Sequence, residues 1–503
     1  MDEIYNKAIQ VNVHLGEGDE RTEVAAKAVN KLGAASLAVL AARKIGVGEE
    51  TMRRQYEKVA DEVLQISQEF PYGKLHPILR LPWFRRVWVF QEVVLARKVV
   101  FYCGERLIAF ENLAFATDFT RVPYSKPDSL SLHWRSYLEG HNACIYHLRL
   151  KEKGEEAKVH HQYLLTIVAN LDVTQPEDKI HAMYGYAKRM ELDWPIPDYT
   201  KSVAQIYTEV TVACFRQSKD LGAILMAIGP ASEEFGLPSW VPDFSRRFTD
   251  YSPSKPPKTD LVPFRNKQCS GATECDWILE PDGRRLKVKG GIVDYITAIS
   301  KPWQADSTTT LLGGADFNSG QVFDSLIECI GSWYEVALQR SMTHNGGADS
   351  AHQFVAISDL VGLLTSAHLG RTTLPDQFAE HISVLISCTR RDMVALRTVF
   401  IHPGNDNNQI SITPQMQQAI ECLMPMIWKL IFRTTVKSCM GISNYNAKAG
   451  DLLVVLHGMA SPCVIRPCAG GFNFIGGAFV PELMNGEFWE RGSDEDDEWF
   501  TLI

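Results

Sequence analysis

The stretch from residue 83 to residue 105, WFRRVWVFQEVVLARKVVFYCGE, decides the fold. Its first part, residues 85–97, is largely apolar and predicts a buried helix with Gln91 and Glu92 in the middle. Its second part, residues 98–103, is rich in β-branched and aromatic side chains and predicts a strand that ends at Gly104. A helix that leads directly into a strand is typical of an α/β layer structure.

A carboxylate in the middle of such a helix needs an explanation. The residues three and four positions away from Glu92 are all apolar: Trp88, Val89, Leu95 and Ala96. Glu92 is therefore not one of the exposed glutamates that pair with a lysine one turn away. On a helical wheel it lies beside the buried stripe, and Arg85 points in nearly the same direction.

Two interpretations of Glu92 follow from this position. In the structural one, the carboxylate pairs with Arg85, Arg86 or a backbone amide and anchors the helix. In the functional one, it faces a cleft at the carboxyl edge of the sheet, where α/β folds bind ligands.

The residues before this stretch supply a second strand and more helices. Residues 9–15 alternate apolar and polar side chains, as in a half-buried strand, and residues 22–44 and 49–70 predict helices. We interpret these elements as a partial, flavodoxin-like parallel sheet with helices. Because an open parallel sheet normally has four or more strands, we expect residues 1–115 to be the C-terminal part of a domain that lacks its opening strands.

The rest of the chain divides by composition. Residues 116–249 are expected to be mainly helical, and residues 250–266, rich in proline and serine, predict a linker. Residues 267–420 are expected to form a variable α+β region. Residues 421–492 hold short strands separated by glycine and proline, which predicts a small β-barrel-like segment. Residues 493–503 begin with SDEDDE and predict a solvated acidic tail.

The bulk composition excludes several classes of protein. With 503 residues, of which 45% are apolar and 22% charged, the chain is long enough for about two to four folded domains. A net charge of −9 argues against a nucleic-acid binder, which needs clustered lysine and arginine. No apolar run is long enough to span a membrane, and the acidic start is unlike a secretory signal. The 11 cysteines have no regular spacing, which favours reduced thiols and a cytoplasmic protein.

No pattern predicts a metal or phosphate site. His141, Cys144 and His147 lie three residues apart on an expected helix, so their side chains diverge and cannot converge on zinc. Cys463 and Cys468 flank an expected strand and have no second cysteine pair close by. Glycine-rich phosphate loops and the G-x-S-x-G elbow of hydrolases are absent too, so we expect neither a metal nor a bound cofactor.

Several stretches together resemble fungal heterokaryon-incompatibility (HET) domain proteins. Residues 83–105 resemble the family motif W-F-x-R-x-W-x-x-Q-E-x-x-L-A, followed by a strand that ends in Cys-Gly. The first residues, MDEIYNKAIQVNVHLG, resemble M-x-x-I-Y-x-x-A-x-x-V-x-V-W-L-G, with His14 in place of the tryptophan. Further resemblances lie in DVTQPEDKIHAMYGYA, PDYTKSV, LPSWVPDF and AGDLLVVLHGMASPCVIRP. Family members usually begin with two more strands, which agrees with the missing strands inferred above.

HET domains are distantly similar to TIR domains, some of which cleave NAD with the glutamate of a W-x-x-x-E helix. Trp88 and Glu92 have this spacing, so the resemblance implies Glu92 as the catalytic carboxylate, with Trp88 and Arg85 as substrate-binding residues. Glu92 would then stabilise the positive charge that develops on the ribose as nicotinamide departs. Trp240 and Asp243 are interpreted as packing and loop-capping residues. The remaining motif residues are interpreted as scaffold: Trp83, Phe84, Arg86, Gln91 and Gly104.

The resemblance implies a protein of self/non-self recognition, a form of fungal innate immunity, which promotes cell death through protein–protein contact. We therefore expect a protein partner or self-association. Two alternatives stay open. One is an NAD glycohydrolase with a TIR-like mechanism, for which NAD is the substrate and Glu92 the catalytic group. The other is a truncated HET product without activity.

Overall fold

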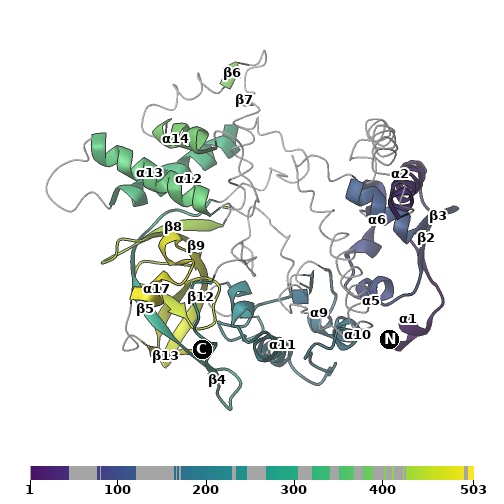
Figure 1. Cartoon of the computed structure of the whole chain (residues 1–503), viewed down its shortest axis with the longest axis horizontal. Helices are drawn as coiled ribbons and strands as arrows, with labels where there is room; N and C mark the ends of the chain where they lie inside the picture. The colour runs from purple at the N-terminus through teal and green to yellow at the C-terminus, as the bar shows by residue number, and fades with distance from the viewer. Residues whose placement is uncertain are drawn as a thin grey trace. The chain divides into compact units, whose positions relative to one another are not determined.

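A computed structural model shows how these segments fold (Figure 1). The described residues are 2–44, 76–79, 81–119, 164–165, 167–168, 171–228, 234–245, 268–303, 320–339, 350–367, 378–388, 401–403, 410–412, 423, 426, 428–491 and 497–503. They form two compact units, Met1–Tyr199 and Thr200–Ile503, and each is considered by itself. The predicted helix at 49–70 and the predicted linker at 250–266 lie outside the described residues.

The first unit contains the partial parallel sheet that the sequence predicts. Strand β1 (Val11–His14) pairs in parallel with β2 (Val99–Cys103), and the expected strands at 9–15 and 98–103 are confirmed. A third strand, β3 (Arg106–Ala109), runs antiparallel to β2 after a tight turn. Gly104 makes this turn with φ +55°, and a Cβ there would collide with the backbone oxygen of Glu17.

Helices cover this small sheet. The predicted helix at 22–44 is confirmed as α2 (Glu20–Lys44), which packs against α6 (Phe110–Phe119). The chain enters α2 through a cap in which Asp19 Oδ1 accepts the Thr22 N–H at 2.7 Å. The other helices of this unit are short: α1 (Asp2–Lys7), α4 (His76–Leu79), α9 (Asp178–His181) and α10 (Tyr184–Arg189).

The predicted continuous helix over residues 85–97 is wrong. A 3₁₀ helix, η2 (Pro82–Arg85), is followed by an extended residue, Arg86, and only then by α5 (Val89–Val94). The break has a long-range cause, because Arg86 forms a parallel β-bridge with Asp172. The Val87 N–H donates to the Asp172 oxygen at 2.9 Å, and the Asp172 N–H donates to the Arg85 oxygen at 2.6 Å. These bonds replace the i→i−4 bonds of a helix, so Arg85 and Glu92 do not share a helix face.

The second unit begins with α11 (Val203–Ser218), whose first turn is closed by a capping box of Ser202 and Gln205. A 3₁₀ helix, η3 (Gly222–Met226), follows. The block LPSWVPDF then crosses the core. Trp240 is fully buried and donates its indole N–H to the Arg284 oxygen, and Asp243 accepts the Ser245 N–H. The packing and loop-capping roles expected for Trp240 and Asp243 are confirmed.

An eight-stranded sheet forms the body of this unit, in the order β10-β11-β12-β13-β5-β8-β9, with β4 also paired to β5. Additional pairings of β10 with β5 and of β12 with β9 give the sheet a barrel-like curvature. Short helical segments, η7 (Pro481–Leu483) and α17 (Glu487–Arg491), lie between its last strands. The strands are β4 (Trp277–Leu279), β5 (Leu286–Ile299), β8 (Lys429–Thr434), β9 (Met440–Asn444), β10 (Leu452–Leu456), β11 (Cys463–Cys468), β12 (Gly471–Phe479) and β13 (Glu498–Leu502).

The barrel-like segment is therefore larger than the predicted 421–492. Strand β5 joins it from the region expected to be variable, and β13 joins it from the expected acidic tail. The tail is corrected for residues 497–503, because Phe500 and Leu502 are fully buried between neighbouring strands. Alternate residues of a strand point to the same side, so Phe500 and Leu502 of the sequence EWFTL lie on one face of the sheet. The backbone of β13 pairs with that of β5.

Asp497, the residue before β13, holds this last strand in place. Its Oδ1 lies 2.8 Å from His457 Nε2, and its Oδ2 lies 2.9 Å from Lys289 Nζ. Desolvation opposes ionisation, but the hydrogen bond from Lys289 and the interaction with His457 outweigh it and lower the pKa of Asp497. A carboxylate with a lowered pKa stabilises the fold above the pKa of the unfolded chain, and this contribution is lost as the pH falls.

We expect Asp497→Asn to lower the free energy of unfolding at pH 7 by about 1–3 kcal/mol, because two charge-assisted hydrogen bonds are weakened. The difference from the wild type should shrink as the pH falls from about 4 towards the lowered pKa of the folded protein, because the wild-type carboxyl group then takes up a proton as well. Denaturant unfolding at several pH values measures it. Glu498→Gln, at an exposed neighbouring carboxylate, is the control. Equal losses for both variants would contradict the role of Asp497.

Three helices pack beside the sheet: α12 (Gly320–Leu338), α13 (Ser350–Ser366) and α14 (Phe378–Cys388). Their common core includes the fully buried Trp303 and Trp333, and α12 contacts β8. A separate hairpin joins β6 (Ile401–Pro403) to β7 (Ile410–Ile412). Among the described residues, no helix combines the length and the apolar character needed to cross a membrane.

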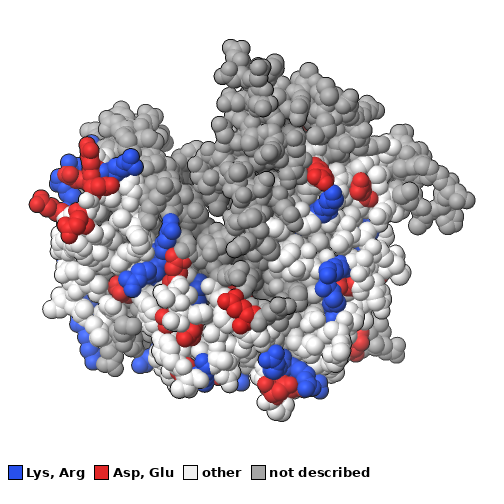
Figure 2. All heavy atoms as spheres, turned by 180° about the vertical axis from the view of Figure 1, so that it is seen from behind, with Lys and Arg blue, Asp and Glu red and all other residues white. Residues whose placement is uncertain are grey.

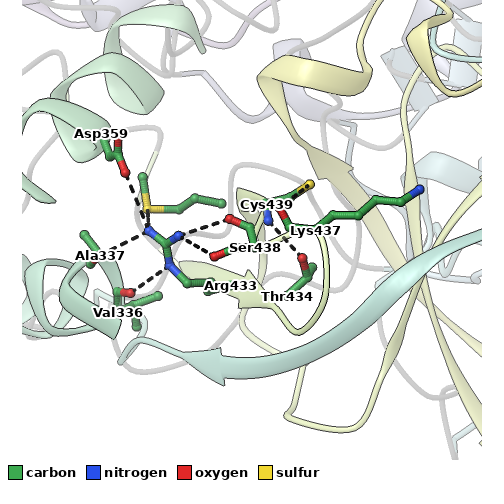
Figure 3. A network of polar contacts seen from close by, with 9 residues as sticks. Val336, Ala337, Asp359, Arg433, Thr434, Lys437, Ser438 and Cys439 are labelled. Carbon is green, nitrogen blue, oxygen red and sulfur yellow. Dashed lines mark hydrogen bonds and ion pairs between the residues drawn. The ribbon is translucent and has the colours of Figure 1, made fainter. Parts of the chain in front are cut away.

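Arg433 of β8 connects these helices to the sheet (Figure 3). Its side chain is buried, with Nε donating to the Val336 oxygen at 3.1 Å and Nη2 donating to the Ala337 oxygen at 3.2 Å. These carbonyls belong to the last turn of α12, where no intrahelical donor remains for them. Nη1 donates to the backbone oxygen and to Oγ of Ser438, at 3.0 and 3.1 Å. One guanidinium group thus ties the end of α12 to the β8–β9 turn.

Candidate functional site

A polar group surrounds Glu92 in the first unit; we call it the Glu92 cluster and define it as Tyr5, Trp83, Arg86 and Glu92. Tyr5 comes from α1 and donates its hydroxyl to Glu92 Oε1 at 3.3 Å. The Trp83 side chain also hydrogen-bonds to Glu92, and the positive charge of Arg86 acts on its carboxylate. Glu92 is half-buried on α5, so this carboxylate is neither in open water nor sealed in the core.

The surroundings of Glu92 raise its pKa above that of an exposed glutamate. Desolvation raises the pKa of Glu92, and the hydrogen bonds from Tyr5 and Trp83 and the charge of Arg86 offset this only in part. Burial and the nearby carboxylate raise the pKa of Tyr5 as well, so Tyr5 stays a hydrogen-bond donor at neutral pH. A half-buried carboxyl group with a raised pKa can hold or transfer a proton, or stabilise a developing cation.

The residues that act on Glu92 differ from Trp88 and Arg85, the two that were inferred from the sequence. Trp88, expected to bind substrate, instead donates its indole N–H to Asp178 Oδ2 at 3.1 Å. Arg85, the second such residue, lies in η2 and has a buried Nε without a hydrogen-bond partner. Arg86, which the sequence suggested as scaffold, acts on Glu92 in its place.

Two further motif residues, Phe84 and Gln91, are buried. Phe84 is buried and packs with Phe101, and Trp83 packs edge-on against both rings. Gln91 is buried and donates its side-chain amide to the Ala182 oxygen. Tyr5, 87 positions from Glu92, was not predicted to be part of the site. Its signal was present, because Tyr5 is the tyrosine of the I-Y-x-x-A pattern.

Glu92 is expected to reduce the stability of the fold at neutral pH. A carboxyl group with a raised folded-state pKa stabilises the fold fully below the unfolded pKa, and this contribution is lost as the pH rises through the folded pKa. Glu92→Gln should therefore be as stable as the wild type at pH 7, or more stable by up to about 1 kcal/mol after solvent screening. The gain should disappear near pH 4.

Thermal unfolding of both proteins between pH 4 and pH 8 checks this expectation. Glu105→Gln, at an exposed glutamate in the turn after β2, is the matched control and should leave the unfolding temperature unchanged. If Glu92→Gln instead unfolds well below the wild type at pH 7, Glu92 is a structural anchor.

Within the described residues, no group of three or more His, Cys, Asp or Glu side chains could hold a metal ion. His141, Cys144 and His147 lie outside these residues. Cys463 and Cys468 both have free thiols and lie at opposite ends of β11.

Comparison with known proteins finds a family match in each of the two units. The family profile described as heterokaryon incompatibility protein (HET) matches residues 1–92, which end at Glu92, and the Het-6 beta-barrel domain matches residues 413–502. The chain is also similar to heterokaryon incompatibility protein 6, OR allele, of Neurospora crassa, with 25% identity over 566 residues. That similarity covers 99% of this chain and 79% of the relative. No solved structure gives a significant match. The chain is therefore a HET domain protein, with its HET segment at residues 1–92 and a Het-6 β-barrel domain at residues 413–502.

Proposed function

We propose that this protein takes part in self/non-self recognition and drives cell death when it meets an incompatible partner protein. The observation that carries this proposal is the combination of a HET segment and a Het-6 barrel domain in a chain similar to heterokaryon incompatibility protein 6 over 99% of its length. Eight cysteines whose side chains the structure describes are free thiols, which supports action in the reducing cytoplasm.

Recognition through protein contact is supported by exposed side chains on the second unit. Trp499 on β13 is 43% exposed, and Ile278 on β4 is 51% exposed. Ile278 pairs with Lys287 of β5, and Trp499 pairs with Lys289, two residues further along the same strand. Because residues two apart in a strand point to the same side, Ile278 and Trp499 lie on one face of the sheet. On the surface in Figure 2, acidic and basic side chains lie in mixed groups. Exposed aromatic and aliphatic residues among mixed charges are typical of protein–protein contacts.

Inducible expression of the full chain in Neurospora strains of different incompatibility genotype tests this proposal. Growth should stop in some genotypes and continue in others, and Trp499→Ala should weaken the arrest without lowering the amount of protein. Equal growth in every genotype, at confirmed expression, would contradict it.

A second function, cleavage of NAD at its nicotinamide–ribose bond, is favoured by one observation, the half-buried Glu92 with a raised pKa. Here contact with the partner would be the trigger and the Glu92 cluster the effector site. Similarity of HET domains to TIR domains supports NAD as the substrate. Incubation of the purified protein with NAD should release nicotinamide, measured by chromatography, both alone and with lysate from an incompatible strain. No release above the blank in either case would remove this function.

A further inference from the structure

The segment from residue 171 to residue 199, which we call the strap, is attached to the motif that carries Glu92. The Arg86–Asp172 bridge joins the two backbones, and Gln91 donates to the Ala182 oxygen. Phe90 packs edge-on against Tyr186, with 5.2 Å between the ring centroids. The strap therefore contacts η2, the extended residue and α5 in turn.

Asp178 joins the C-terminal end of the strap to the motif that carries Glu92. Its Oδ2 accepts the indole N–H of Trp88 at 3.1 Å, and its Oδ1 accepts the hydroxyl of Tyr199 at 2.8 Å. Trp88 is the N-cap residue of α5, four positions before Glu92. Tyr199 is the last residue of the first unit, where the chain passes into the second.

The Tyr199 end of this arrangement is accessible. The Tyr199 side chain is 61% exposed, and its ring packs edge-on against His181, with 4.7 Å between the centroids. Desolvation and the hydrogen bond to Asp178 raise the pKa of Tyr199 to about 12, so its hydroxyl remains a donor. The neighbouring Asp198 N–H donates to His181 Nε2 at 3.3 Å. These contacts lie at the surface, where a bound partner or a movement of the second unit can break them without opening the core.

We propose that Asp178 is a latch that couples the junction at Tyr199 to the helix that carries Glu92. The Asp178 carboxylate accepts from Trp88 and from Tyr199 at the same time only in one orientation of its side chain. Loss of the Tyr199 hydroxyl frees the carboxylate to rotate, which weakens its bond to Trp88 and loosens the start of α5. Coupling of this kind is reciprocal, so loss of the Trp88 N–H must loosen the Tyr199 end by the same factor.

Hydrogen–deuterium exchange on the full chain tests the latch. Tyr199→Phe removes only the hydroxyl, and it should raise exchange about three- to tenfold both in residues 194–199 and in α5 (Val89–Val94), which lies far earlier in the chain. Trp88→Phe should raise exchange at residues 194–199 by a similar factor. Asp178→Asn keeps only one acceptor oxygen, so one of the two hydrogen bonds is lost, and the coupling should then raise exchange in both segments.

The matched control is Tyr102→Phe on β2, whose hydroxyl makes no hydrogen bond to another described residue; it should change neither segment. If Tyr199→Phe raises exchange at residues 194–199 and leaves α5 unchanged, Tyr199 only fixes its own end and the latch is refuted. An effect of Trp88→Phe confined to α5 would refute it as well. Neither result depends on whether the protein cleaves NAD.

Discussion

Arg433→Met is expected to lower the free energy of unfolding of the second unit by about 3 kcal/mol or more. The substitution keeps most of the apolar volume and removes every donor of the guanidinium group. The carbonyl oxygens of Val336 and Ala337 and the Ser438 oxygen would lose their donors. Each buried acceptor without a donor costs about 1–3 kcal/mol.

The partner variants separate this explanation from a simple ion pair. Asp359 lies 3.9 Å from Arg433 Nη2 and is 26% exposed, so Asp359→Asn should cost less than about 1 kcal/mol. Arg433→Lys keeps the charge and supplies one donor group in place of the planar fork, so its loss should be intermediate. Denaturant unfolding followed by circular dichroism gives the three values. If Asp359→Asn costs as much as Arg433→Met, the ion pair rather than the capping of α12 stabilises this contact.

Glu92→Gln is expected to reduce any nicotinamide release by at least about 100-fold. Glutamine keeps the shape of the side chain and one acceptor oxygen for Tyr5, but it cannot carry the negative charge that stabilises a cationic transition state. Glu92→Asp keeps the charge but shortens the side chain by one methylene, so it should retain some activity. Tyr5→Phe removes a hydrogen bond that lowers the pKa of Glu92, so the pKa of Glu92 should rise in this variant. The dependence of nicotinamide release on pH should then shift to higher pH.

The elements that could be predicted from the sequence are those that local periodicity determines. The alternation in residues 9–15 and the apolar run at 98–103 gave β1 and β2, and the cap at Asp19 marks the start of α2. Each of these signals lies within the element itself. The parallel pairing of β1 and β2 followed from the helices between them.

The elements that could not be predicted depend on distant partners. The helix expected over residues 85–97 breaks at Arg86 because that residue bridges to Asp172, which no local pattern reveals. Strand β13 was hidden by the acidic run before it, although Phe500 and Leu502 alternate as in a buried strand. Its burial required β5, more than 190 residues earlier in the chain.

The candidate site shows the same division. Glu92 could be singled out because its neighbours one turn away are apolar, and the motif spacing supported this choice. The position of Arg85 beside Glu92 was inferred from one continuous helix, and the break at Arg86 changes it. Trp88 was inferred from its motif spacing, and its indole bonds to Asp178, which lies far along the chain. Tyr5 belongs to another helix and reaches Glu92 only through the tertiary fold.

We propose that Glu92 serves the function of the protein and not its folding. The test is the growth of an incompatible strain that expresses either the wild type or Glu92→Gln at equal protein abundance. We expect arrest with the wild type and normal growth with a Glu92→Gln protein that is folded and as stable as the wild type. Arrest by both proteins alike would contradict it.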